Sequence, residues 1–321
     1  MTGLVEVESC DINQKDYMRN TPLGWAAVNG HEEVVRMLLE RDDIDPNRRD
    51  NHGNTPLRSA VYNGHEGVVK LLLGRDDVDP NLPDRSRCTP LCGAAKDGHE
   101  GIVELLLGRD DLNPNKPDGH DQTPLLWAAY QGHEGVVKLL LGRDDVDPNL
   151  PDRSRCTPLL LVASKGHEGI VKILLGRHDI EPDKPDKGGR TPLLRAAENG
   201  HEAVVRILLR RDDVDPNKSC SQGQTLLWLA AWKGHEGIVK TLLGRDDIEP
   251  DKPDKGGRTP LMRAAENGHD AVVRMLLGRD DVDPNKPDNN GRTPLMCAAQ
   301  NCHPGVMTLS QPPTTATHST T

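Results

Sequence analysis

One phrase returns at a constant interval through most of the chain. A threonine recurs every 34 residues, nine times without insertion or deletion, and Pro-Leu follows it in eight of the nine copies. A Gly-His pair follows further on in eight copies, from Gly30-His31 to Gly268-His269. So strict a period predicts a stack of small structural repeats and argues against independent globular domains. The nine threonines are Thr21, Thr55, Thr89, Thr123, Thr157, Thr191, Thr225, Thr259 and Thr293.

Residues 191–224 illustrate what each copy can form. Thr191 suits the N-cap of a short helix, Pro192 suits its first position, and Gly200 can end it in a left-handed conformation. His201 then opens a second helix, whose apolar residues recur at helical spacing: Val204, Val205, Leu208 and Leu209. Neither helix is long enough to be stable alone, so each must pack against the neighbouring copy.

The composition limits the core, the compartment and the kinds of partner. The 321 residues include no Phe, three Tyr and four Trp, so the core must consist of many small Leu, Val and Ala contacts. Seven scattered Cys do not resemble a secreted disulfide framework, and residues 1–17 lack a signal-peptide pattern. No apolar run approaches the length of about 18 residues that a membrane span needs. We therefore predict a protein of the cytoplasm, with the nucleus as the alternative, that is neither secreted nor bound to a membrane.

The repeated phrases resemble the unit of the ankyrin-repeat family. The shared features are Thr-Pro-Leu-x-x-Ala-Ala, the Gly-His pair, the Leu-Leu end of the second helix and the Gly-x-Thr-Pro-Leu return. The resemblance implies paired antiparallel helices, protruding hairpin fingers and a concave groove for macromolecular partners. Residues 65–91 recur identically at 133–159, which is similar to the near-identical arrays of fungal ankyrin-repeat proteins.

The predicted fold is accordingly an all-α ankyrin-repeat solenoid of helix–turn–helix units with hairpin fingers, about nine 34-residue repeats long. We expect an incomplete N-terminal repeat at residues 1–20, the repeats at 21–303 and a disordered C-terminal tail at 304–321, although 302–307 look like the start of a second helix. Cys220 replaces the Asp of seven other turns, so a looser turn is expected there.

One helix position departs from the family pattern. The family usually has His after Thr-Pro-Leu, where it bonds to the Thr hydroxyl, and this sequence never does. We expect a mostly apolar seam to replace that hydrogen bond. The nine residues of the seam are Gly24, Arg58, Cys92, Leu126, Leu160, Leu194, Trp228, Met262 and Met296.

Residues that suggest chemistry have structural explanations. The nine His of the repeats share one slot at the start of the second helix, so a structural role is favoured over a metal site. Cys88, Cys92 and His99 are a weaker zinc candidate, because the two Cys belong to different parts of the unit. Asp77-Val78-Asp79-Pro80-Asn81 lacks the later ligands of a calcium loop and is interpreted as a solvated helix terminator. No enzyme, cofactor, metal or small-molecule substrate is expected.

The exposed side of the first helices is the predicted binding surface. Aromatic residues gather there, and such residues are enriched at interface hot spots. The alternative is that Trp25 and Trp127 only fill gaps between helices. The candidate residues on this face are Trp25, Tyr62, Trp127, Tyr130, Trp232 and Lys233.

The fingers add basic residues beside this face. They carry Arg85, Arg87, Arg153, Arg155, Lys187, Arg190, Lys255 and Arg258, whereas the acidic residues concentrate in the Arg-Asp-Asp loops. This segregation favours a protein partner with an acidic segment, and simple solvation is the alternative. The formal net charge of −10 argues against nucleic acid as the main partner.

The expected function is a non-catalytic protein–protein interaction scaffold that uses the groove and the finger tips. The alternative is the recognition or regulatory arm of a larger multidomain signalling or surveillance protein.

Overall fold

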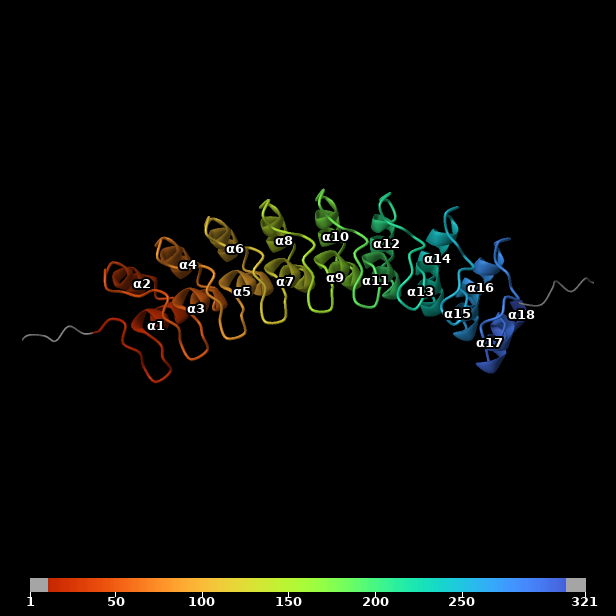
Figure 1. Ribbon diagram of the computed structural model, residues 1–321, viewed down its shortest axis with the longest axis horizontal. Helices are drawn as coiled ribbons and strands as arrows, with labels where there is room; N and C mark the ends of the chain where they lie inside the picture. Colours follow the sequence, from red (N-terminus) through yellow and green to blue (C-terminus); the bar gives the residue numbers. More distant parts are fainter. Residues whose placement is uncertain (1–10, 310–321) are drawn as a thin grey trace, which may run out of the picture. The chain divides into compact units, whose positions relative to one another are not determined.

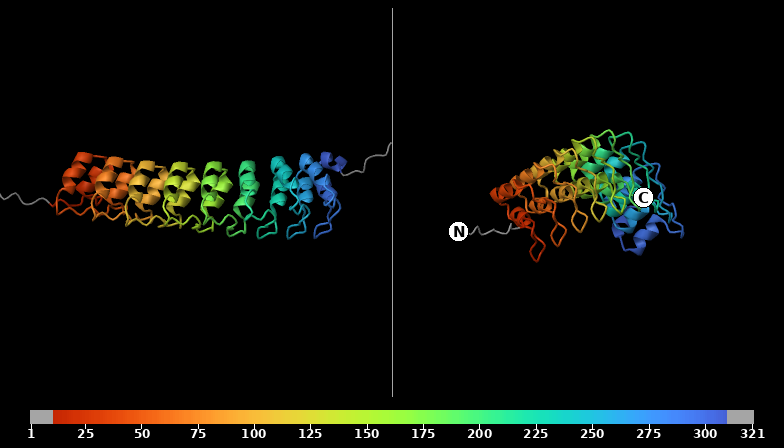
Figure 2. Two further views of the ribbon diagram at one scale, coloured as in Figure 1. Left: turned by 90° about the horizontal axis from the view of Figure 1, so that it is seen from above. Right: turned by 60° about the vertical axis from the view of Figure 1, so that its left-hand side comes forward.

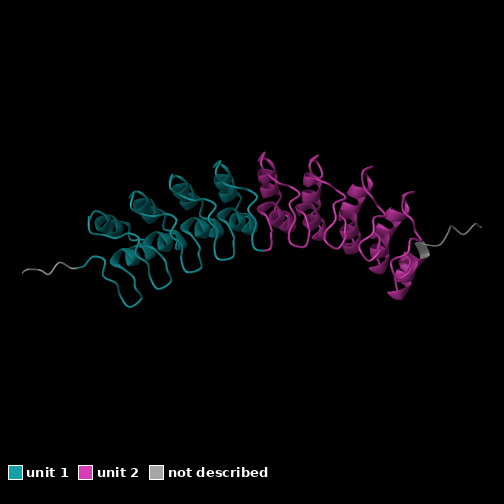
Figure 3. Ribbon diagram, viewed as in Figure 1, with its two compact units in different colours: residues 1–153 teal, residues 154–321 magenta. Residues whose placement is uncertain are grey.

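The computed structural model describes residues 11–309, in which the chain forms eighteen short α-helices and no β-strand. The helices follow one another in pairs, joined by loops (Figure 1). Two compact units divide the chain, unit 1 at residues 1–153 and unit 2 at residues 154–321 (Figure 3). The all-α repeat fold expected from the period is confirmed.

Unit 1 contains four helix pairs. Its first helices pack on one another in a row and its second helices form a parallel row, while the fingers protrude on one side (Figure 2, left). The first helices are α1 (Pro22–Val28), α3 (Pro56–Tyr62), α5 (Pro90–Asp97) and α7 (Pro124–Gln131). The second helices are α2 (Glu32–Leu39), α4 (Glu66–Leu73), α6 (Glu100–Leu107) and α8 (Glu134–Leu141).

Unit 2 repeats this arrangement with five pairs. Its first helices are α9 (Pro158–Lys165), α11 (Pro192–Glu198), α13 (Leu226–Lys233), α15 (Pro260–Glu266) and α17 (Pro294–Gln300). Its second helices are α10 (Glu168–Leu175), α12 (Glu202–Leu208), α14 (Glu236–Leu243), α16 (Asp270–Leu277) and α18 (Pro304–Leu309). Within the described residues, no helix is both long and apolar enough to cross a membrane.

The ends of the first helices follow from local chemistry. Each repeat threonine is the N-cap, and its Oγ1 accepts the backbone N–H three residues later at 3.1–3.4 Å. In the pair formed by α11 and α12, Gly200 then turns the chain with a left-handed φ of 77°. The helices are only six to eight residues long, so their stability depends on packing between repeats.

The seam is apolar and buried in most repeats, as expected. Six of its residues are almost fully buried: Cys92, Leu126, Leu160, Leu194, Trp228 and Met262. Arg58 is the charged exception and is only 7% exposed, whereas Met296 in the last repeat is 56% exposed. The indole Nε1 of Trp228 donates to the carbonyl of Arg258 at 3.0 Å, so even this large ring has its polar atom satisfied.

Six of the nine repeated histidines link adjacent repeats, which confirms the predicted structural role for those six. In six repeats the ring Nε2 lies 3.0–3.3 Å from a backbone carbonyl 37 residues earlier, for example His201 from Ser164. Because a carbonyl only accepts, Nε2 must carry the proton. Among the described residues, no group of three or more His, Cys, Asp or Glu side chains is placed to hold a metal ion.

The Arg-Asp-Asp loops also link repeats, which corrects their interpretation as solvated terminators. Nε and Nη2 of Arg75 bind the carboxylate of Asp77 at 2.8 and 2.7 Å, and Nη1 donates to the carbonyl of Leu39 at the end of the preceding second helix. Asn47 forms a further link, since its Nδ2 donates to the Asp77 carbonyl and its Oδ1 accepts the N–H of Asp79. The loop is therefore a cap for the preceding repeat as well as a turn.

Three local expectations concern the turn at Cys220 and the two ends. Cys220 closes the usual turn, because its N–H donates to Gln224 and its carbonyl accepts from Gly223. It lacks the carboxylate that, at Asp186, accepts two further backbone N–H groups, so the turn keeps its shape with fewer bonds. Residues 304–309, expected to belong to the disordered tail, are helical; residues 310–321 lie outside the described part.

At the other end, the predicted incomplete repeat is described from residue 11. Asn13 donates to the carbonyl of Asp43 and accepts the N–H of Asp45, the same link that Asn47 makes one repeat later. These contacts are those of the loop that follows the second helix of a repeat. The bounds of the three predicted segments stay predictions.

Candidate partner-binding face

The candidate site combines the first helix of each pair with the finger that precedes it. We call it the partner face: the outward side chains of the first helices, together with the finger tips at residues 17–19 and their equivalents every 34 residues. Tips of neighbouring fingers within a unit are joined by single backbone hydrogen bonds, such as that from the N–H of Arg85 to the carbonyl of His52 at 3.1 Å. The fingers therefore support one another laterally.

In unit 1 the four candidate aromatic residues keep part of their surface exposed. Tyr62 on α3 is 68% exposed, Trp25 on α1 is 45% exposed and Tyr130 on α7 is 39% exposed. Trp127, also on α7, is half-buried. Exposed rings of this size are unusual in a chain with so few aromatic residues, and the structure places all four on first helices.

The two tryptophans of unit 1 are fixed in orientation by the fingers. Trp25 Nε1 donates to Asp16 Oδ2 at 2.8 Å, and Trp127 Nε1 donates to Asp118 Oδ2 at 3.0 Å. The Nζ of Lys96 lies 4.6 Å from the centre of the Trp127 ring, a cation–π contact. Packing between a helix and its finger is thus part of their role, yet neither ring is enclosed.

In unit 2 the aromatic candidate is Trp232, which is half-buried. Its ring centre lies 5.7 Å from that of Trp228 at an interplanar angle of 49°. The Nζ of the exposed Lys233 lies 4.1 Å from the Trp232 ring, and the Arg263 guanidinium lies 5.8 Å from it. Two cations therefore lie near one partly exposed indole.

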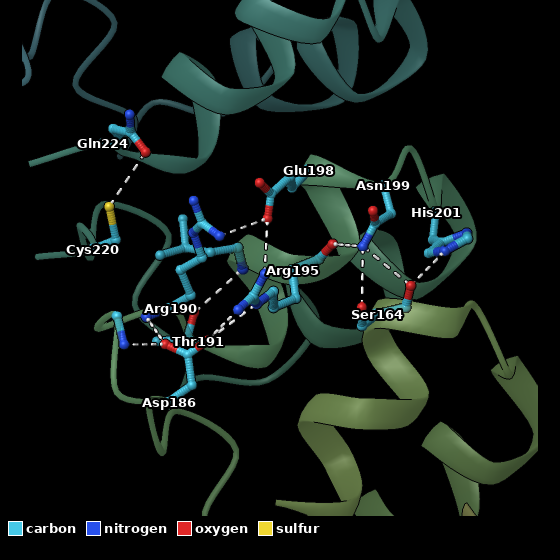
Figure 4. A network of polar contacts seen from close by, with 12 residues as sticks. Ser164, Asp186, Arg190, Thr191, Arg195, Glu198, Asn199, His201, Cys220 and Gln224 are labelled. Atoms are coloured by element: carbon cyan, nitrogen blue, oxygen red, sulfur yellow. Dashed lines mark hydrogen bonds and ion pairs between the residues drawn. The ribbon is translucent and has the colours of Figure 1, made fainter. Parts of the chain in front are cut away.

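A charged network covers the partner face beside α11 (Figure 4). Arg195 binds Asp186 through Nε at 3.1 Å and Glu198 through Nη1 at 3.3 Å, and Arg190 lies 3.4 Å from the same Glu198 carboxylate. Burial opposes ionisation of Asp186, but the backbone N–H of Arg190 and the guanidinium of Arg195 outweigh it and hold the pKa of Asp186 below its ordinary value. This part of the face is therefore internally neutralised.

The eight basic finger candidates fall into two groups. Three form ion pairs within the repeats: Arg153 with Asp121 at 3.3 Å, Arg190 with Glu198 at 3.4 Å and Arg258 with Asp254 at 3.3 Å. The other five are exposed and have no ion pair within the described residues: Arg85, Arg87, Arg155, Lys187 and Lys255. These five carry the positive charge that the fingers can offer to a partner.

Two of those five hold a backbone conformation that favours glycine. The third residue of every finger tip has a positive φ; five of the nine tips use Gly there, whereas Arg87 and Arg155 have φ of 63°. A side chain in the left-handed region costs roughly 1–2 kcal/mol. Strain of this kind is often found at functional positions, so these two arginines gain support as contact residues.

The acidic loops are less charged than the sequence suggests. In the seven Arg-Asp-Asp loops and the equivalent Arg-His-Asp loop at 177–179, the Arg binds the Asp two residues later at 2.6–2.8 Å. A hydrogen bond from the guanidinium lowers the pKa of the paired Asp, as at Asp111. Ion pairs therefore reduce both the positive charge of the fingers and the negative charge of the loops, and the expected contrast between them is smaller.

Sequence reasoning missed three residues of the partner face. Tyr17, in the first finger tip, is 94% exposed, and it lies 34 residues before Asn51 and 68 before Arg85. Arg195 and Arg263 occupy the same helix position as Trp25 and Trp127. In each case the period itself was the available signal.

The arrangement offers aromatic surface, fixed indoles and exposed cations, which are groups that bind another macromolecule. A family model described as ankyrin repeats (3 copies) matches residues 2–84, 76–152, 136–220, 159–254 and 227–312. Among curated proteins, none matches the chain.

Proposed function

The chain belongs to the ankyrin-repeat family, whose members are in general protein–protein interaction modules, and from that premise we propose a non-catalytic scaffold that binds a protein through the partner face. The observation that carries the proposal is the row of exposed aromatic side chains on the first helices, above all Tyr62 at 68% exposure. Ring positions of this kind act as anchors because they bury much area at little entropic cost.

The chemistry of the fingers favours a partner segment with acidic side chains. Arg87 and Arg155 extend from a strained but hydrogen-bonded turn, so the backbone that carries their charges is already ordered before a carboxylate binds. Lys187 and Lys255 add charge at the first position of their own finger tips, two residues before the position that Arg87 and Arg155 occupy in theirs. Acidic and aromatic contacts would therefore be made together, with the aromatic groups giving affinity and the charges giving orientation.

The test begins with capture of partners from native lysate by the full chain. A variant with Tyr62→Ala, Tyr130→Ala and Trp232→Ala should lose the partner, because about 1–2 kcal/mol or more is expected for each anchor. A matched control carries Lys70→Ala, Lys138→Ala and Lys172→Ala on the exposed side of the second helices and should retain it.

The partner so identified is then titrated as a purified protein. Equal affinity for both variants would refute the partner face as the binding surface. Loss of binding in the control alone would place the site on the second helices instead.

A further inference from the structure

Arg58 is buried in an unusual setting within unit 1. It occupies the seam and is 7% exposed, yet its Nε and Nη1 have no hydrogen-bond partner in the part of the chain that the structure describes. Its Nη2 lies 3.5 Å from Asp84 Oδ2 and 3.6 Å from the sulfur of Cys88. A Cβ at position 93 would lie only 2.9 Å from Arg58 Nη1, so Gly93 is what gives the guanidinium its room.

A second thiol meets Cys88 at the same place. Cys92 in the seam is fully buried, its sulfur lies 3.6 Å from the carbonyl oxygens of Lys116 and Gln122, and its side chain interacts with that of Cys88. Cys88 is only half-buried and lines a cleft of about 380 Å³ that also borders Tyr62 and Trp127. An accessible thiol thus lies beside a sheltered one.

The surroundings of Cys88 favour its ionised form. The hydrogen bond from the Cys92 thiol and the positive charge of Arg58 lower the pKa of Cys88, although burial and the carboxylate of Asp84 oppose them. The same contact and burial raise the pKa of Cys92. Cys88 therefore ionises to a thiolate more readily than Cys92, which keeps its proton.

A second copy of the sequence around Cys88 lies 68 residues later and can be compared with it. Residues 85–91 are identical to 153–159, so Cys156 has the same flanking sequence as Cys88. At the positions equivalent to Arg58 and Cys92, however, that copy has Leu126 and Leu160. Of these two copies, only the one at Cys88 combines the finger cysteine with the basic residue on the preceding first helix and the second thiol on the following one.

We propose that Cys88 and Cys92 form a peroxide-oxidisable dithiol in which Arg58 positions and stabilises the reactive thiolate. The Cys88 sulfur attacks a hydroperoxide, the O–O bond breaks, an alcohol or water leaves after taking a proton, and Cys88 becomes a sulfenic acid. Cys92 then attacks that sulfur, its proton leaves with the hydroxyl as water, and a disulfide forms. The sulfurs lose two electrons in total and the hydroperoxide gains them.

Oxidation would alter the partner face directly. The Arg58 guanidinium lies 5.8 Å from the Tyr62 ring, and disulfide formation removes the neighbouring thiolate charge. This consequence depends on the proposed function, whereas the oxidation itself does not.

The experiment uses the full reduced chain and hydrogen peroxide. Cleavage after Arg87 and Lys96 releases residues 88–96, which contain both cysteines and no others, while residues 156–165 give a one-cysteine reference peptide. In the wild type, peptide 88–96 should lose two hydrogens and resist alkylation. In Cys92→Leu, the residue of the sister copy, no disulfide should form and Cys88 should be trapped by a 1,3-diketone as a sulfenic acid.

Arg58→Leu, also taken from the sister copy, tests the activating cation. The rate of Cys88 oxidation should fall by about threefold for each unit by which the thiol pKa rises, because lower nucleophilicity partly offsets the larger thiolate fraction. Circular dichroism checks that both variants fold. The proposal is overturned if peptide 88–96 of the wild type stays fully alkylatable after peroxide, or if Arg58→Leu leaves the rate unchanged.

Discussion

At the scale of single residues, the finger tips combine backbone strain with exposed charge. Arg87 has a φ of 63° at a position where Gly53 serves in the preceding finger. We expect Arg87→Gly to stabilise the fold by about 0.5–1 kcal/mol, since relief of the left-handed strain outweighs the added freedom of the unfolded chain. The same change should weaken binding of the partner. Urea unfolding measures the first effect and titration the second.

Arg85 provides the control for this prediction. It lies in the same finger tip and is also exposed, but its φ is not positive. Arg85→Gly should therefore not stabilise the chain. A similar gain from both substitutions would show that removal of positive charge, and not relief of strain, is responsible.

Two glycines of one repeat differ in the backbone conformation and the space that they would offer to a Cβ atom. Gly98 has a φ of 79°, and a Cβ there would lie 2.7 Å from the His133 ring. Gly108 has a φ of −72°, and the nearest atom to its Cβ would be 3.4 Å away. We expect Gly98→Ala to cost about 2 kcal/mol and Gly108→Ala to be neutral or stabilising. Chemical unfolding of the two variants tests this, and equal costs would contradict it.

At the scale of elements, the loops after the second helices make stability depend on pH. In unit 1 the guanidinium hydrogen bonds lower the pKa of Asp77, Asp111 and Asp145. A carboxyl with a lowered folded pKa stabilises the fold fully above its unfolded pKa, about 4, and loses that effect as the pH falls through the folded value. Stability should thus be level near neutrality and decline below about pH 4.

Substitution can isolate this contribution. A triple variant with Asp77→Asn, Asp111→Asn and Asp145→Asn should lose about 1–2 kcal/mol at pH 7, a modest sum because the carboxylates are half-exposed and screened. Its difference from the wild type should disappear in acid. The control changes the preceding residues, Asp76, Asp110 and Asp144, to Asn and should have little effect. A difference that persists at pH 2 would rule out the ion pairs as its source.

At the scale of the whole molecule, the 34-residue period predicts which residues occupy equivalent positions, but it does not predict which residues of neighbouring repeats contact each other. It correctly identified the threonine caps and the shared histidine slot, because both depend on chemistry within one repeat or on a position that recurs. It could not show that Arg75 would cap the helix ending at Leu39, 36 residues earlier. Such pairs depend on how far each repeat is displaced from the last.

The partner face shows the same limit. The candidate aromatic residues were found because helical spacing places them on one side of the first helices. The neutralisation of Arg190 by Glu198 was not, since it requires the distance between a finger and the helix that follows it. Charge counted along a sequence therefore overestimates the charge that a repeat surface presents.

If the chain is stabilised mainly by contacts between repeats, the same substitution should lower the free energy of unfolding more where the side chain contacts the preceding repeat than where it does not. His235 Nε2 lies 3.3 Å from the carbonyl of Glu198 in the preceding repeat, whereas His31 in the first pair is exposed and has no ring hydrogen bond within the described residues. His235→Ala should cost about 1–2 kcal/mol, because a bond is lost and a carbonyl is left unpaired, and His31→Ala should cost close to zero. Urea unfolding of the two variants compares these costs. Equal destabilisation would mean that the ring acts within its own helix pair, as an N-terminal residue of the second helix, and that the link to the preceding repeat contributes little.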